Sequence, residues 1–103
     1  MSRINILKSF LESDPNDSFS RYALALEYVK ASLHDDAVRE FETVKTNDPD
    51  YVATYYQLGK LYQQLSRLHE AEKTFRMGMT VATKLNDEHT RSELEAALEE
   101  LLS

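Results

Sequence analysis

The sequence of 103 residues contains no cysteine, two glycines and two prolines. Without cysteine the chain can form neither a disulfide framework nor a thiolate metal site, which suits a reducing compartment, and we expect a cytoplasmic protein. Because glycine and proline interrupt helices most strongly, their scarcity predicts helix nearly throughout. A chain of this length suffices for one domain that buries roughly 65% of the surface exposed by its unfolded form.

Basic residues and long apolar runs are also scarce. Twelve lysine and arginine residues stand against 18 aspartate and glutamate residues, a formal net charge of −6. This is the wrong sign for tracking phosphates, so we expect no nucleic-acid partner. No run approaches the roughly 20 apolar residues that span a bilayer, and Lys8 and Ser9 interrupt the apolar residues near the start. We therefore expect neither a membrane segment nor a secretory signal.

One pattern of residues occurs twice, 34 residues apart. The later copy is Tyr55-x2-Leu58-Gly59-x2-Tyr62, followed by Ala71-x3-Phe75. The earlier copy is Arg21-x2-Leu24-Ala25-x2-Tyr28, followed by Ala37-x3-Phe41. Asp14-Pro15 and Asp48-Pro49 repeat at the same interval and mark the ends of helices. A fixed period of this length predicts stacked helical repeats that bury each other's apolar faces.

The repeated pattern and the helix ends marked by the Asp-Pro pairs predict an all-α solenoid of six helices in three antiparallel hairpins. The expected helices lie near residues 3–13, 17–32, 35–47, 51–66, 69–84 and 88–102. Paired helices should approach closely where small residues face each other, with a phenylalanine filling the space beside them. These sets are Ala25, Ala37 and Phe41 in the first copy, and Gly59, Ala71 and Phe75 in the second.

We expect residues 1–103 to form a single domain with two full repeats, at 18–51 and 52–85. Residues 1–17 supply a helix and linker that look like half of a missing repeat, covering the inner face of helix 17–32. Its apolar residues Ile4, Leu7, Phe10 and Leu11 align with Val38, Phe41, Val44 and Lys45. Residues 86–103 carry the apolar stripe of a capping helix, with a detachable docking helix as the alternative.

The residues quoted above resemble the tetratricopeptide repeat (TPR) family over positions 18–85. The departures are Arg21 in place of an aromatic residue, Ser32 and Ser66 in place of a turn glycine, Val44 and Gly78 in place of alanine, and Thr83 in place of the closing proline. The resemblance implies a right-handed superhelix in which the first helix of each pair lines a concave groove. Such grooves hold an extended peptide or a partner's helix, and the resemblance implies no catalysis.

One branch of this family grips the carboxylate end of chaperone tails with lysine, asparagine and arginine side chains. The corresponding positions here hold Tyr22, Leu26 and Gln57. That carboxylate clamp is therefore absent from this sequence.

A second apolar line on helix 17–32 is the candidate binding surface. It consists of Phe19, Tyr22, Leu26 and Val29, at helical spacings of three, four and three. The aligned line on helix 51–66 is Ala53, Tyr56, Lys60 and Gln63, and Lys30 and Gln64 flank the two lines. We expect apolar anchors of a ligand to lie on the first line, with Lys30 or Lys60 meeting an acidic group or a backbone carbonyl. The alternative is that the first or last helix folds across this line and buries it.

Two short fragments resemble parts of metal-dependent hydrolases, and neither is complete. His34-Asp35-Asp36 and His69-Glu70 fall where helices begin, and Lys73 stands where a zinc-protease motif needs a second histidine. Acidic residues in the first turn of a helix are favoured by its dipole, which explains both fragments. No phosphate-binding glycine loop or nucleophile elbow occurs in the sequence. We expect no enzyme activity and no cofactor.

These observations predict a non-enzymatic adaptor that holds a peptide segment or a helix of a partner protein in its groove. The alternative is a structural or assembly protein that self-associates as a homodimer, through the same apolar line or through an end of the stack.

Overall fold

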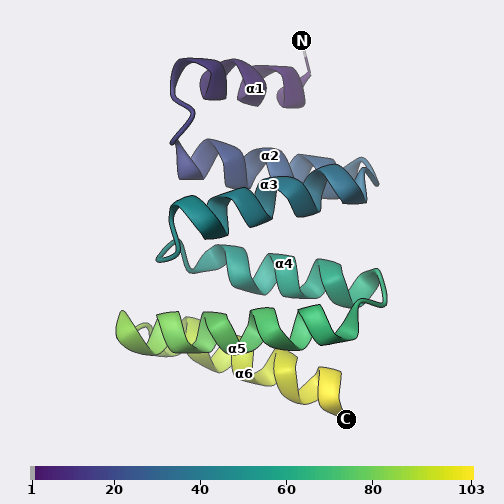
Figure 1. Ribbon diagram of the computed structural model, residues 1–103, viewed down its shortest axis with the longest axis vertical. Helices are drawn as coiled ribbons and strands as arrows, with labels where there is room; N and C mark the ends of the chain where they lie inside the picture. The colour runs from purple at the N-terminus through teal and green to yellow at the C-terminus, as the bar shows by residue number, and fades with distance from the viewer. Residues whose placement is uncertain (1) are drawn as a thin grey trace. The chain divides into compact units, whose positions relative to one another are not determined.

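The computed structural model describes residues 2–103, and over this range it consists of six α-helices joined by short turns, without a strand (Figure 1). The helices are α1 (Arg3–Ser13), α2 (Ser18–Lys30), α3 (His34–Asn47), α4 (Ala53–Gln64), α5 (Leu68–Lys84) and α6 (Glu88–Leu102). The predicted all-α class is confirmed, and each helix begins and ends within two residues of its expected range. The agreement follows from the 3.6-residue apolar periodicity and from the few residues able to break it.

The chain divides into two compact units, Met1–Asp48 and Pro49–Ser103, which we call unit 1 and unit 2 and describe separately. In unit 1, α2 packs against both α1 and α3. In unit 2, α5 packs against α4 and α6, and α6 also touches α4. Residue 1, where the predicted segment 1–17 begins, lies outside the described residues. The predicted single domain and its internal boundaries remain predictions.

In unit 1 a phenylalanine is enclosed by small residues. Phe41 of α3 is completely buried, as are Ala25 of α2 and Ala37 of α3. Because alanine keeps the two backbones close, the ring can fill the remaining space between α2 and α3. The predicted burial of Phe41 is confirmed.

Unit 2 repeats this arrangement with an even smaller residue. Phe75 and Ala71 of α5 are completely buried, and a Cβ atom added to Gly59 of α4 would overlap the Phe75 ring. Gly78 is a second close approach, because a Cβ there would lie 2.5 Å from the Tyr55 Cβ and 2.9 Å from the Leu94 Cδ1. This contact explains why glycine stands at position 78, where the family often has alanine.

Three helix ends share one turn geometry. Ser32, Ser66 and Asn86 have φ angles of 59°, 61° and 58°. In each turn the next amide donates a hydrogen bond to the carbonyl five residues earlier: Leu33 to Tyr28 (2.9 Å), Arg67 to Tyr62 (2.8 Å) and Asp87 to Ala82 (2.8 Å). This is the Schellman motif, whose left-handed residue is usually glycine because glycine has no Cβ to clash. The two serines therefore hold a conformation that glycine would adopt more easily.

Arg21 makes the hydrogen bond that an aromatic residue makes in the second repeat. The Tyr55 hydroxyl donates to the Pro49 carbonyl at 2.6 Å, and the Arg21 Nη2, 34 residues earlier, donates to the Pro15 carbonyl at 3.0 Å. Arg21 Nη1 also lies 2.6 Å from the Glu40 carboxylate. The departure from the family pattern at Arg21 thus preserves the connection between the helix and the turn before it.

We predict that Gly78→Ala lowers the free energy of unfolding by about 1–3 kcal/mol, because the new methyl group must displace Tyr55 or Leu94 in a packed interior. Urea denaturation followed by circular dichroism measures the change. The control is Ser92→Ala, on the exposed side of α6, which we expect to stay within about 0.5 kcal/mol of wild type. Unchanged stability of Gly78→Ala would contradict the close approach.

We predict the opposite effect at the two serine turns. Ser32→Gly and Ser66→Gly should each raise the free energy of unfolding by about 1 kcal/mol, because glycine relieves the left-handed strain. Ser92→Gly, in the middle of α6, should instead lower it by about 0.5–1 kcal/mol. Thermal unfolding of the three variants tests the prediction, and destabilisation by Ser32→Gly would show that the turn does not need this conformation.

Candidate functional site

The residues of the predicted binding surface lie on two helices, α2 of unit 1 and α4 of unit 2. We describe each set within its own unit and call the two sets the α2 line and the α4 line. The α2 line is Phe19, Tyr22, Leu26, Val29 and Lys30, and the α4 line is Tyr56, Lys60, Gln63 and Gln64.

The α2 line occupies the least covered side of its helix. Phe19 is 57% exposed, Lys30 is exposed, and Tyr22, Leu26 and Val29 are half-buried. The side of α2 away from Phe19 carries buried residues, among them Ala25 and Tyr28. The helix begins at a capping residue, Asp17, whose carboxylate accepts a hydrogen bond from the Ser20 amide at 3.1 Å. This cap places Phe19 in the first turn of α2, at one end of the line.

Helix α1 packs against a different side of α2. The Arg3 guanidinium lies 3.3 Å from the Glu27 carboxylate, and the Lys8 ammonium lies over the Tyr28 ring, 6.0 Å from its centre. Tyr28 lies about 180° around the helix from Phe19. Within unit 1, α1 therefore leaves the Phe19 ring accessible.

Tyr22 also contributes to the packing of unit 1. Its ring meets the buried Phe41 ring edge-on, with centroids 5.9 Å apart and planes at 61°. Aromatic pairs of this geometry stabilise a fold by about 0.5–1.5 kcal/mol beyond their buried area. Replacing Tyr22 would therefore affect both the core and the candidate surface, so Phe19 and Leu26 are the better residues with which to examine binding.

The α4 line is more polar and is partly engaged by α6. Tyr56, Lys60 and Gln63 are half-buried, and Gln64 is exposed. The Lys60 ammonium lies 3.7 Å from the Glu100 carboxylate of α6. The Gln63 side-chain oxygen is buried and has no hydrogen-bond partner among the described residues. An acidic ligand at Lys60 would have to compete with Glu100.

Phe10 is exposed although the residue aligned with it in the first repeat, Val44, is buried. In α1 the buried residues are Leu7 and Leu11, and Phe10 is 52% exposed. Phe10 lies about 100° around α1 from Leu11, beyond the strip that α2 covers. No helix is described on the outer side of α1 within unit 1.

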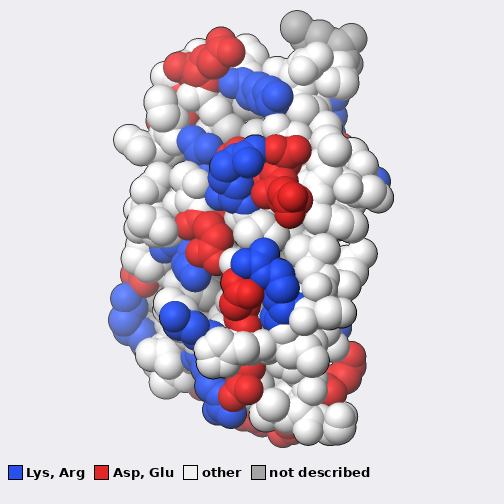
Figure 2. All heavy atoms as spheres, turned by 45° about the vertical axis from the view of Figure 1, so that its right-hand side comes forward, with Lys and Arg blue, Asp and Glu red and all other residues white. Residues whose placement is uncertain are grey.

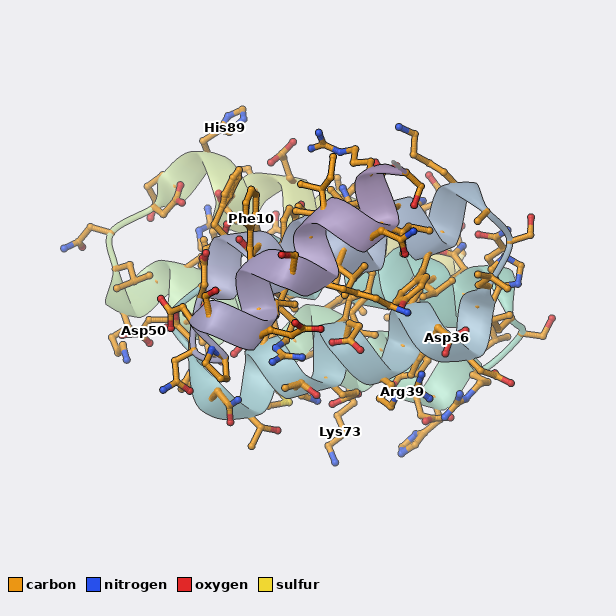
Figure 3. All side chains as sticks on the ribbon, turned by 90° about the horizontal axis from the view of Figure 1, so that it is seen from above. Phe10, Asp36, Arg39, Asp50, Lys73 and His89 are labelled. Atoms are coloured by element: carbon orange, nitrogen blue, oxygen red, sulfur yellow. The ribbon has the colours of Figure 1, made fainter. Side chains whose placement is uncertain are left out.

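A shallow hollow on the outer face of α5 was not expected from the sequence. It has a volume of about 340 Å³ and is lined by His69, Glu72, Lys73, Arg76, Met77 and Thr80. Arg76 is bound by Glu72 at 3.0 Å, whereas the Lys73 side chain extends away from the molecule (Figure 3). These residues are spaced as the solvent face of an amphipathic helix, and nothing in their pattern distinguishes a hollow from a flat surface.

Shifted pKa values occur at helix caps. The pKa of Asp17 is lowered from its ordinary value of 3.8, first by a hydrogen bond from the Ser20 hydroxyl and then by one from the Ser20 amide. The pKa of Asp87 is lowered from 3.8 by the Thr90 amide and then by its hydroxyl. Each cap therefore stabilises the fold fully above about pH 4, and its contribution is lost as the pH falls through the lowered pKa.

Residues 2–103 contain neither a cluster of metal ligands nor a membrane-spanning helix. No group of three histidine, aspartate or glutamate side chains in this range is arranged to hold a metal ion. His34 and His69 lie in the first turns of α3 and α5, as expected for residues that begin a helix. No helix in the same range combines the length and apolar character needed to cross a bilayer.

Antiparallel helix pairs closed by small residues define the class of the protein as a helical-repeat protein. The chain belongs to the tetratricopeptide repeat family. A family model described as tetratricopeptide repeat matches residues 52–80. The solution structure of a tetratricopeptide repeat domain protein from Salinibacter ruber is 43% identical and superposes with a TM-score of 0.82, covering 85% of this chain and 89% of that chain.

More distant structures share the same fold. The TPR2B domain of yeast Sti1, solved as a complex with pHsp70, has 14% identity and a TM-score of 0.88, covering 95% of this chain and 78% of that chain. PcrH, solved with the chaperone binding region of PopD, has 18% identity and a TM-score of 0.88, covering 96% and 75%. At these identities the likeness concerns the fold alone. A search of curated proteins found no match.

We predict that the Lys60–Glu100 contact contributes little to stability, because both side chains are substantially exposed, at 37% and 68%. A double-mutant cycle with Lys60→Gln and Glu100→Gln should give a coupling energy below about 1 kcal/mol, which falls further in high salt. Urea denaturation of the four proteins measures it. A larger coupling would mean that the contact fixes the end of α6, which would leave Lys60 unable to serve a ligand.

Proposed function

We propose that this chain is a non-enzymatic interaction module that holds a segment of a partner protein against the α2 line. Apolar side chains of the partner seat on Phe19 and Leu26, and Lys30 meets an acidic group at the end of the line. The α4 line, within unit 2, is a separate set of polar side chains with Lys60 as its cation. A cytoplasmic setting, suggested by the sequence without cysteine, is part of the proposal.

The observation that carries the proposal is the exposure of a large aromatic ring on a helix that is otherwise well packed. Phe19 is 57% exposed at the end of a line of half-buried apolar residues, while Leu24 and Ala25 of the same helix are at most 2% exposed. Scattered single apolar residues on a surface need no explanation, but a continuous line at helical spacing does. Large rings in such lines are the side chains that most often dominate binding energy.

The family and its structures support a protein ligand. In the yeast Sti1 and PcrH structures, TPR folds were solved together with pHsp70 and with the chaperone binding region of PopD. The charges of this chain also favour a peptide over a polyanion. On the face that Figure 2 shows, acidic and basic side chains lie next to one another, rather than in a broad basic field. Nucleic-acid binding would need such a basic field.

The competing proposal is self-association through the α2 line. Light scattering over a range of concentrations distinguishes the two. If the protein is a monomer at high micromolar concentration, self-association is excluded. If it is a dimer that Phe19→Ser converts to a monomer, the α2 line is an interface between two copies and is not open to a partner.

We predict that Phe19→Ser weakens peptide binding at least tenfold with little effect on folding. The probes are peptides selected on the immobilised protein from a displayed random library, and fluorescence anisotropy measures their affinities. Loss of a dominant apolar anchor costs about 2–4 kcal/mol of binding, and each 1.4 kcal/mol is a tenfold change in affinity. Because the ring is largely exposed, the melting temperature should change little.

The matched control for this test is Leu102→Ser, since Leu102 of α6 is 55% exposed. It should leave affinity unchanged. The proposed function would be wrong if no peptide were enriched, or if the enriched peptides bound wild type and Phe19→Ser equally.

A further inference from the structure

Two apolar side chains of α1 are exposed at the surface of unit 1. Ile6 is 38% exposed and Phe10 is 52% exposed, and the Phe10 ring projects from the side of α1 (Figure 3). Arg3, Ile6 and Phe10 are spaced by three and four residues, so they form one stripe along α1. This stripe was not part of the surface predicted from the sequence.

The α1 stripe lies on the same side of unit 1 as Phe19. The two helices meet through Leu7 and Leu11 of α1, and Lys8 lies over the Tyr28 ring on one side of that contact. Phe10 is about 160° around α1 from Lys8, and Phe19 is about 180° around α2 from Tyr28. Both rings therefore emerge on the other side of the contact between the helices.

The two helices also run antiparallel. The cations of the two helices therefore lie toward one end of the pair, and the aromatic rings lie toward the other end. Arg3, at the start of α1, lies 3.3 Å from Glu27, near the end of α2. Phe10 consequently lies near the opposite end, within about one turn of Phe19. The α1 stripe runs from the cation Arg3 to the Phe10 ring, and the α2 line runs in the same direction in space from the cation Lys30 to the Phe19 ring.

The cationic end of this surface carries more positive than negative charge. The Arg3 Nε and the Lys30 Nζ lie 3.3 Å and 3.4 Å from the same oxygen, Oε2 of Glu27. One carboxylate therefore serves two cations, whose side chains are 64% and 74% exposed. An acidic group brought to this end would meet an excess of one positive charge.

We propose that α1 and α2 together form a docking surface for an amphipathic helix of a partner protein, which carries an acidic residue at the end beside Arg3 and Lys30. This rests on the proposed function and adds α1 to it. From Phe19 to Lys30 the surface is about 16 Å long, which matches about three helical turns. Apolar residues of the partner at spacings of three and four pack along the α1 stripe and the α2 line.

The test uses a displayed library of amphipathic helices of about 12 residues, with an apolar stripe and randomised ends. Selection on the wild-type protein should enrich aspartate or glutamate at one end. Phe10→Ser should weaken the selected peptides at least tenfold, as Phe19→Ser does, while Leu102→Ser should not. The combination of Arg3→Glu and Lys30→Glu should shift selection toward lysine and arginine at that end, and Lys73→Glu is the matched charge control on α5.

Circular dichroism shows whether each variant is folded, and nuclear magnetic resonance locates the peptide if a variant is not. Peptide-induced shifts on both α1 and α2 of the wild-type protein support the proposal. Loss of affinity in Phe19→Ser but not in Phe10→Ser, with shifts confined to α2, would overturn the role of α1 and leave the proposed function standing. Selection without an acidic preference would overturn the charge assignment, and failure to enrich any peptide would overturn both proposals.

Discussion

The close approach of paired helices is the constraint on which this structure depends. Ala25, Ala37 and Phe41 are completely buried in unit 1, and in unit 2 Phe75 and Ala71 are completely buried and the Phe75 ring lies against Gly59. A larger residue at any of these positions would separate the helices and leave the ring without close contacts on one side. Because the two units use the same combination of sizes, each repeat acquires a similar helix pair from a different sequence.

Departures from the family pattern preserve this geometry through other interactions. Arg21 replaces an aromatic residue and still donates a hydrogen bond to a proline carbonyl, as Tyr55 does in the second repeat. Ser32 and Ser66 replace glycine and still adopt the left-handed conformation that closes the Schellman turn. In both cases the side chain changes while the backbone requirement is met. More than one residue type can donate a hydrogen bond to a backbone carbonyl, and more than one can adopt the left-handed conformation that ends a helix.

The candidate surface results from what the packing leaves uncovered. Helix α2 is packed on two sides by α1 and α3, so the third side, with Phe19 and Leu26, has no helix of unit 1 against it. In the proposed function its apolar residues give binding energy and its cations give orientation, because an apolar contact is non-directional whereas an acidic group is favoured only beside Arg3 and Lys30. The exposed Phe19 and the buried Leu24, Ala25 and Tyr28 thus lie on different sides of one helix, while Tyr22 lies between them and packs on Phe41.

The sequence by itself determined the helices, the 34-residue period and the burial of Phe41 and Phe75, because these follow from local periodicity and from side-chain size. It also indicated the α2 line, whose four apolar residues stand apart from the packing stripe. Only the tertiary structure decided that Phe10 is exposed, that Lys60 lies against Glu100 and that Arg3 and Lys30 share Glu27. A periodic pattern shows which residues share a side of a helix, but the width of the strip that a neighbouring helix covers depends on how the two helices pack.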